Sequence, residues 1–319
     1  MAQLLTEPFT QLHVAFDPDP LLCEIERLGK QPWVEHPLGN LHSIPLVRIV
    51  DNKACWCSVI DALPKLRALL HTWKAPIGDS RVSILEPGAA VKKHVDVDYY
   101  WKHRLRVHLV LKTNPAALFG CGEEVLSLPT GQIWVSNNWA PHWIANNGDT
   151  NRIHIVIDTV GSPTLWKWIH EGWNSTSGIQ IPKTVDLPKL SLTARAPQLT
   201  LERSSREPIR SPAQLQEIVE DCLNDMKNTA NAHTIDRCRM QLRILMSTWH
   251  SIYLHHMDNS AAYPLYETAL RNTLADLPNP IFWNGVDLHT TLNTQVGASL
   301  MTQPTGKDPS TKQAHRTQG

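Results

Sequence analysis

Two segments in the middle of the chain alternate between polar and apolar side chains with the period of a β-strand. In residues 104–111, one face carries two arginines and a histidine, and the other carries only leucine and valine. In residues 152–158, an arginine, a histidine and an aspartate share one face, opposite three isoleucines. The ordinary explanation is a sheet with one solvated face, and alternation alone favours it. The alternative is that the polar face lines a cavity.

Short β-branched runs separated by turn residues extend this pattern across the middle of the chain. The breaks between them hold Pro-Gly, Asn-Pro and Asn-Gly pairs, which are typical of turns. The runs with the strongest strand character span residues 81–85, 104–111, 132–136 and 151–158. Short strands at this spacing predict a mainly β core with the architecture of an antiparallel sandwich or jelly roll.

Helical periodicity flanks the β-rich segment on both sides. Apolar residues recur at helical spacing over about residues 17–30, 61–73, 233–256 and 261–275. Ser211, followed by Pro212 and Gln214, has the form of a helix N-cap with a capping box. We therefore divide the chain into a jelly-roll core with N-terminal helices, a proline-rich connection, a helical region and a disordered tail, over residues 1–171, 172–211, 212–301 and 302–319. The helical region is a candidate lid or homodimer element.

Composition narrows the class of protein without assigning a function. The 319 residues are 42% hydrophobic and 19% charged, which is enough to build a buried core. Basic and acidic residues number 30 each, so no basic excess exists to follow a phosphate backbone or an anionic membrane. The six cysteines lack metal-finger spacing, and the first residues lack the pattern of a secretory signal. We expect a cytoplasmic protein with free thiols that binds neither nucleic acid nor membrane.

His94 and Asp96 are the first candidates for metal chemistry. In an extended segment, residues two apart point to the same side, so this imidazole and carboxylate converge on one point. Such a pair is common by chance and needs a third ligand, for which His142 in the loop-like segment 137–147 is the candidate. Two histidines and one carboxylate leave three positions open, which suits non-heme Fe(II) with a chelating co-substrate and O2. A structural zinc would be closed by four protein ligands.

Arg152 is the candidate for holding the co-substrate. 2-Oxoglutarate chelates iron through its keto acid end, so its distal carboxylate needs a buried, permanently charged, forked partner. Arg152 lies ten residues after His142 and begins an alternating strand on its polar face. With a carboxylate to bind, that polar face is an expected feature. Ser83 and His108 are candidates for hydrogen bonds to the carboxylate nearer the metal, and each has an equal alternative as a satisfied core polar group.

Together these segments resemble the aspartyl/asparaginyl β-hydroxylase family, which includes the bacterial cis-4-proline hydroxylases. The resemblance is carried by RVSILEPGAAVKKHVD (81–96), RLRVHL (104–109), the run from Gly131 to His142, and NRIHIVID (151–158). It covers about a quarter of the chain, and the combination is more specific than any one piece. The resemblance implies a double-stranded β-helix, a cupin-like jelly roll, that uses Fe(II), 2-oxoglutarate and O2.

The resemblance also implies a role for each candidate residue. It makes His94 and His142 metal ligands, Arg152 and His108 binders of 2-oxoglutarate with help from Ser83, and Arg106 a substrate contact. Vertebrate-type members carry glycine where this chain has Asp96, which places the chain nearer the bacterial amino-acid hydroxylases. The implied reaction hydroxylates an amino acid or amino-acid residue, free, peptidyl or carrier-bound, and gives the hydroxylated product, succinate and CO2.

Several alternatives stay open at the level of the sequence. A zinc or manganese cupin, either an isomerase or a hydrolase, would use the same triad without needing a buried arginine. A non-catalytic cupin-like binding module would keep the pocket without needing all three ligands. Within the oxygenase interpretation, desaturation or cyclisation could replace hydroxylation. The segments 97–103 and 212–276 match no family motif; we expect them to enclose a small substrate whose carboxylate faces Arg106.

Overall fold

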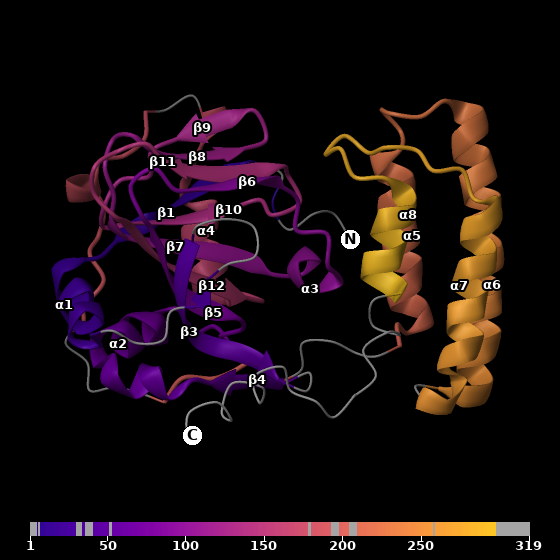
Figure 1. Ribbon diagram of the computed structural model, residues 1–319, viewed down its shortest axis with the longest axis horizontal. Helices are drawn as coiled ribbons and strands as arrows, with labels where there is room; N and C mark the ends of the chain where they lie inside the picture. Colours follow the sequence, from indigo (N-terminus) through magenta and orange to yellow (C-terminus); the bar gives the residue numbers. More distant parts are fainter. Residues whose placement is uncertain are drawn as a thin grey trace, which may run out of the picture.

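The computed structural model describes residues 5, 7–29, 34–35, 41–50, 53–177, 180–192, 198–203, 209–257 and 259–297. Within these ranges, two antiparallel sheets form a sandwich, and helices flank it on both sides (Figure 1). The tail predicted over residues 302–319 lies outside the described residues. No helix in the described ranges combines the length and the apolar character that crossing a bilayer requires.

The larger sheet has nine strands. They are β1 (Phe9–Ala15), β2 (Val34–Glu35), β3 (Leu41–Val50), β4 (Lys53–Trp56), β5 (Ser80–Leu85), β7 (Leu105–Lys112), β10 (Gln132–Ser136), β12 (Arg152–Thr159) and β13 (Trp173–Asn174). The smaller sheet is formed by β6 (Ala90–His94), β8 (Ala117–Cys121), β9 (Glu124–Leu126) and β11 (His142–Asn146). The strands predicted from β-branched runs are confirmed, with bounds shifted by about one residue.

The eight strands from β5 to β12 are ordered as a double-stranded β-helix. One sheet holds them in the order β5-β12-β7-β10, and the other in the order β6-β11-β8-β9. Successive strands therefore cross between the sheets, except that β8 and β9 form a hairpin within the smaller one. This arrangement confirms the predicted cupin-like jelly roll, built as an open sandwich of two sheets rather than a closed barrel.

The outer face of the larger sheet forms the main hydrophobic core with the flanking helices. These helices are α1 (Asp19–Arg27), the 3-10 helix η1 (Ser58–Ala62), α2 (Pro64–Thr72) and α4 (Pro163–His170). Leu109 of β7 and Ile155 of β12 are fully buried there with Leu66 of α2. The inner face is polar, yet Arg106 and Arg152 are only 7% and 3% exposed. Alternation alone favours a polar face open to solvent. That interpretation is wrong, because the smaller sheet covers the polar side chains.

The C-terminal helices have a hydrophobic core of their own, in which Trp249 and Tyr266 are fully buried. The elements of this part are α5 (Pro212–Asp225), α6 (Ala232–His256), η4 (Ser260–Ala262), α7 (Tyr263–Asp276), α8 (Leu288–Leu292) and the π-helical turn η5 (Asn293–Gly297). The capping box predicted at Ser211 and Gln214 is formed. Figure 1 shows these helices, orange to yellow, beside the sandwich and next to α3 (Tyr99–Lys102). The short η2 (Ser175–Ser177) and η3 (Thr184–Asp186) precede them.

Candidate metal and co-substrate site

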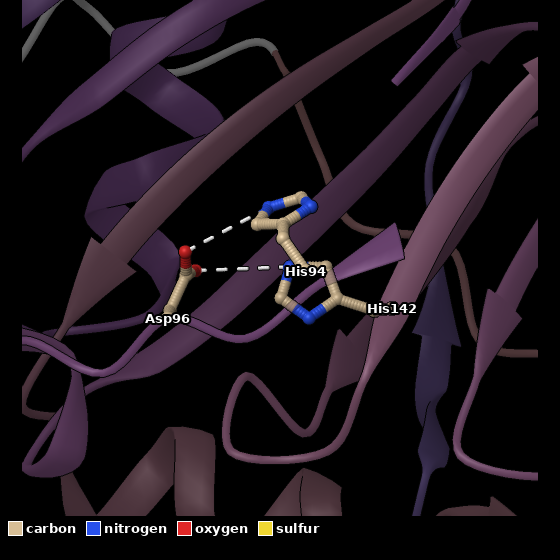
Figure 2. A group of neighbouring side chains, drawn as sticks. All are labelled: His94, Asp96 and His142. Atoms are coloured by element: carbon tan, nitrogen blue, oxygen red, sulfur yellow. Dashed lines mark ion pairs between the residues drawn. The ribbon is translucent and has the colours of Figure 1, made fainter. Parts of the chain in front are cut away.

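His94, Asp96 and His142 converge where β6 and β11 meet. His94 ends β6, His142 begins β11, and the two residues are direct partners in the antiparallel pairing. The Nε2 atom of each histidine lies 3.8 Å from a carboxylate oxygen of Asp96. Ligand atoms of all three residues lie within 4.8 Å of one another, and Figure 2 shows the side chains turned toward a common point. This spacing fits one small cation bound by two imidazoles and a carboxylate.

Backbone carbonyls fix the orientation of both imidazole rings. Nδ1 of His94 lies 2.7 Å from the carbonyl oxygen of Lys92, and Nδ1 of His142 lies 3.0 Å from that of Ala140. A proton on each Nδ1 satisfies these carbonyls and leaves the lone pair of each Nε2 facing the metal position. Burial lowers the pKa of His142 to about 4, so its ring is neutral at physiological pH, as a metal ligand must be.

Asp96 is kept ionised by the cationic groups around it. Burial on its own would raise the pKa of this carboxyl, but the guanidinium of Arg106, with a smaller contribution from Arg81, outweighs burial and holds the pKa below its usual range. Arg106 Nη1 donates a hydrogen bond to Asp96 Oδ2 at 2.5 Å. The backbone N–H of Asp96 donates to the carbonyl oxygen of Asn138 at 3.1 Å. The carboxylate is therefore fixed in place and available as an anionic ligand.

Arg106 is bound on two sides by carboxylates. Its Nε and Nη2 donate to the two oxygens of Asp158 at 2.9 and 3.0 Å, while its Nη1 holds Asp96. Arg106 and Asp158 are direct partners across β7 and β12, so the strand register builds this pair. Trp101 completes the group by donating its indole N–H to Asp158 at 3.0 Å. The role of Arg106 as a substrate contact stays a prediction, and the three occupied nitrogens favour a role in positioning Asp96.

A cavity of about 810 Å³ opens between the two sheets at the triad. Its walls include every residue predicted from the sequence to form the site: His94, Asp96, His142, Ser83, His108, Arg152 and Arg106. The polar faces of β5, β7 and β12 supply the last four of these. The structure therefore brings the predicted residues together around one cavity, large enough for a chelating co-substrate and a small substrate side by side.

Arg152 carries a buried positive charge with no carboxylate beside it. Its side chain is 3% exposed, and no acidic group in the described part of the chain forms an ion pair with it. Its Nη2 has no hydrogen-bond partner among the described residues. Burial lowers its pKa to about 9, as expected for a cation removed from water without a counter-ion. The ring of Phe119 lies 5.8 Å from the guanidinium carbon. A carboxylate entering the cavity would complete this position.

Further polar groups without protein partners lie on the strands beside Arg152. His108 Nε2 lies 3.2 Å from Ser136 Oγ, whereas its Nδ1 has no partner among the described residues. Burial, followed by the charge of Arg152, lowers the pKa of His108 well below its usual value, so the ring is neutral. Ser83 is buried in the cavity wall. Its strand partner His154 is fully buried, and neither ring nitrogen has a partner in the described ranges.

These residues fit the metal and the co-substrate that the resemblance implies. The triad offers three ligands, and the described residues place no fourth histidine, cysteine or carboxylate in the same group, as a closed zinc site would require. The buried guanidinium of Arg152, which has no acidic partner among the described residues, is complementary in charge to the distal carboxylate of 2-oxoglutarate. Neutral His108 and Ser83 can donate or accept hydrogen bonds within the same cavity.

The segment 97–103 joins the site to the helical region. It contains α3, whose Lys102 pairs with Asp221 of α5 at 2.5 Å. The hydroxyl oxygen of Thr294 in η5 lies 3.3 Å from the carbonyl oxygen of Val97, and nearer to the carbonyl oxygens of Thr290 and Thr291 in the preceding α8. A second cavity of about 340 Å³ adjoins the first at Asp96 and is lined on its far side by α5, α8 and η5. The two segments predicted to enclose the substrate therefore lie against each other beside the triad.

A comparison with protein families places the central part of the chain. The family model of aspartyl/asparaginyl beta-hydroxylase matches residues 48–161. Residues 48–161 belong to this family. The match spans β5 to β12, so this hydroxylase domain contains the complete double-stranded β-helix and every predicted site residue. The domain is a 2-oxoglutarate-dependent dioxygenase of the Fe(II) type, and its triad is of the kind that binds that metal.

Solved structures show only distant likeness to the hydroxylase. A prolyl-4-hydroxylase from Pseudomonas putida is 14% identical with a TM-score of 0.34, over 48% of this chain and 92% of its own. A 2OG-Fe(II) oxygenase family protein from Burkholderia pseudomallei is 12% identical with a TM-score of 0.36, over 44% and 79%. A predicted oxalate decarboxylase from Thermotoga maritima is 12% identical with a TM-score of 0.26, over 40% and 89%. Likenesses this weak do not decide between functions.

Two features of the site differ from the sequence prediction or were missed by it. His142, expected in a loop-like segment, is the first residue of β11, because the residues after it pair with β8 on one side and β6 on the other. Asp158 was assigned no role, although it holds Arg106. The alternating pattern had placed both residues on polar faces, but only the strand order puts one opposite the other.

Proposed function

We propose that this hydroxylase acts on an amino acid or an amino-acid residue and gives the hydroxylated product, succinate and CO2. His94, Asp96 and His142 are the metal ligands, and Arg152 anchors 2-oxoglutarate. The observation that carries the assignment is the environment of Arg152: a buried cation without a counter-ion, in the same cavity as a three-ligand metal site. Neither a non-redox metal cupin nor a binding module needs that charge.

Each residue of the cavity has a defined task in this reaction. The bound Fe(II) supplies activation of O2 by oxidative decarboxylation of 2-oxoglutarate, which puts one oxygen atom into succinate and the other into the product. The triad would hold the ion through three ligands and would leave the rest of its coordination sphere to the co-substrate and O2. Arg152 pairs with the distal carboxylate, while Ser83 and His108 hydrogen-bond the co-substrate nearer the metal. Arg106 holds the Asp96 carboxylate at a fixed angle.

The surroundings of the cavity support a small substrate. The matching family is named for hydroxylation of aspartyl and asparaginyl residues, so an amino-acid substrate is in keeping with it. Trp101 of α3 and Thr294 of the helical region line the cavity together with Asp96, so both segments contribute to the wall beside the triad. A substrate enclosed in this way is small or presents a single residue to the metal.

The test is succinate formation from 2-oxoglutarate by the Fe(II)-loaded protein, with mass detection of a one-oxygen gain in amino acids and short peptides. We expect succinate to form only with Fe(II) and 2-oxoglutarate together. The Arg152→Gln variant should lose this activity. The matched control, Arg27→Gln at an exposed position of α1, should retain it. A protein that turns over a substrate with zinc or manganese and ignores 2-oxoglutarate would contradict the proposal.

A further inference from the structure

We propose that Asp79 and Arg81 form a clamp for the ammonium and carboxylate groups of a free α-amino acid. This inference rests on the proposed function, since it names the substrate class of the same cavity. Sequence analysis assigned neither residue a role, although Arg81 opens the motif at 81–96.

The fold puts the two side chains next to each other on the cavity wall. Asp79 directly precedes β5 and Arg81 is its second residue, so both lie on one face, two residues apart. Ser83 follows on the same face, and all three line the cavity that holds the triad. The partner of Arg81 across the sheet is Val156 of β12, which offers it no charge. The clamp therefore adjoins the co-substrate residues without overlapping Arg152.

Asp79 and Arg81 are two charged residues near the triad that form no ion pair among the described residues. Five charged residues meet near the metal position, and Arg106 satisfies both Asp96 and Asp158. In the described part of the chain, neither Asp79 nor Arg81 forms an ion pair, and Arg81 Nε has no hydrogen-bond partner. One cation and one anion thus line the cavity, two residues apart on one face of the strand, with no ion pair between them among the described residues.

The pKa shifts of Asp79 and Arg81 agree with the absence of an ion pair at either group. Burial, aided by the nearby Asp158, raises the pKa of Asp79. Burial, aided by the nearby Arg106, lowers the pKa of Arg81. Each charged form lacks full compensation in the ligand-free protein, and a ligand of matching charge would supply it.

A free α-amino acid has the complementary chemistry. Its carboxylate and ammonium sit on one carbon, so a single small molecule can meet a forked guanidinium and a carboxylate that lie two residues apart on a strand. A residue inside a peptide has neither charge and would leave both side chains desolvated and unpaired. A site that binds polar groups in this way strongly rejects analogues that lack them. The geometry therefore selects free amino acids over peptidyl ones.

The first experiment offers each common L-amino acid to the Fe(II)-loaded protein with 2-oxoglutarate, and reads succinate and a one-oxygen mass gain. The responding amino acid is then compared with its N-acetyl and C-terminal amide derivatives. We expect kcat/KM to fall at least a hundredfold for both derivatives. A derivative used as well as the free amino acid overturns the clamp, and so does hydroxylation confined to peptides.

The second experiment locates the clamp. Arg81→Gln and Asp79→Asn should each raise KM for the amino acid at least tenfold while changing KM for 2-oxoglutarate less than twofold. Arg81→Lys should lie between, and the exposed Arg27→Gln should match the parent. Calorimetric titration of the amino acid into Mn(II)- and 2-oxoglutarate-loaded protein should show the same order of affinities. Parental affinity in Arg81→Gln overturns the clamp.

The outcomes separate this inference from the function on which it rests. If 2-oxoglutarate binds and is consumed but only peptides are hydroxylated, the clamp is wrong and the oxygenase assignment stands. If 2-oxoglutarate neither binds nor is consumed in any mixture, the proposed function is wrong, and the clamp falls with it.

Discussion

Arg106 and Arg152 are two buried arginines on neighbouring strands that face one cavity, yet their electrical surroundings are opposite. Arg106 has all three guanidinium nitrogens on carboxylates, and these carboxylates outweigh burial and raise its pKa. Arg152 has no acidic partner in the described ranges, and burial lowers its pKa to about 9. The comparison separates two uses of a buried cation. A paired arginine holds the protein's own groups in place, whereas an unpaired one is completed by a ligand.

The largest expected effect is the loss of metal binding, because both arginines are proposed to act on groups that meet at the metal position. His142→Ala removes a ligand whose ring is already neutral and oriented by the Ala140 carbonyl. We expect loss of stoichiometric Fe(II) binding and no detectable turnover, because two remaining ligands do not hold the ion. Metal analysis after dialysis checks this, with the exposed His71→Ala on α2 as the matched control. Parental iron content in His142→Ala would show that the triad is assigned incorrectly.

The next effect tests the paired arginine through stability. Asp158→Ala leaves Arg106 buried with one carboxylate instead of two, so we expect the free energy of unfolding to fall by about 3–5 kcal/mol. Urea denaturation measures it. Combining Arg106→Met with Asp158→Ala should cost less than the sum of the two single losses, because the two side chains pair with each other, although Asp96 also loses Arg106 in the double variant. An additive double variant would mean that the two side chains are not coupled.

The unpaired arginine should behave in the opposite way. Arg152→Met keeps the length of the side chain and removes a buried charge without a counter-ion, so the ligand-free protein should gain about 1 kcal/mol of stability or more. 2-Oxoglutarate with Mn(II) should raise the melting temperature of the parent and leave that of the variant almost unchanged. A destabilised Arg152→Met would indicate that this cation already has a protein partner.

The last effect, spread over about two pH units, is a pH dependence from His154, the buried neutral histidine two residues after Arg152 on β12. Burial lowers the pKa of His154 well below its usual value, whereas the unfolded chain titrates near about 6.5. Below that pH the unfolded state binds a proton that the folded state excludes, so stability falls on acidification by about 1.4 kcal/mol per pH unit. Unfolding measured between about pH 7 and pH 5 should show a shallower slope in His154→Gln. Equal slopes would contradict the burial of a neutral ring.

Local sequence patterns predicted which residues line the site better than they predicted which of these residues pair with each other. That the triad and Arg152 line one cavity agrees with the prediction from the sequence, which used the shared face of i and i+2 residues and the fit of a forked cation to a carboxylate; their roles stay predictions. The pairing of Arg106 with Asp158 was not predictable, since it depends on β7 lying beside β12, and strand order is set by long-range contacts. The expectation of a solvated polar face was wrong for the same reason. Period-two alternation reveals that a strand has two different faces, but which face is covered depends on the position of the second sheet.

The account depends most directly on how Arg152 contributes to co-substrate binding. The decisive measurement is the dissociation constant of 2-oxoglutarate for the Fe(II)-loaded protein without O2, in the parent and in Arg152→Met at equal metal content. Leaving a buried carboxylate unpaired costs about 2–5 kcal/mol, so we predict a rise of at least about thirtyfold. Parental affinity in Arg152→Met, with iron fully bound, would contradict the account.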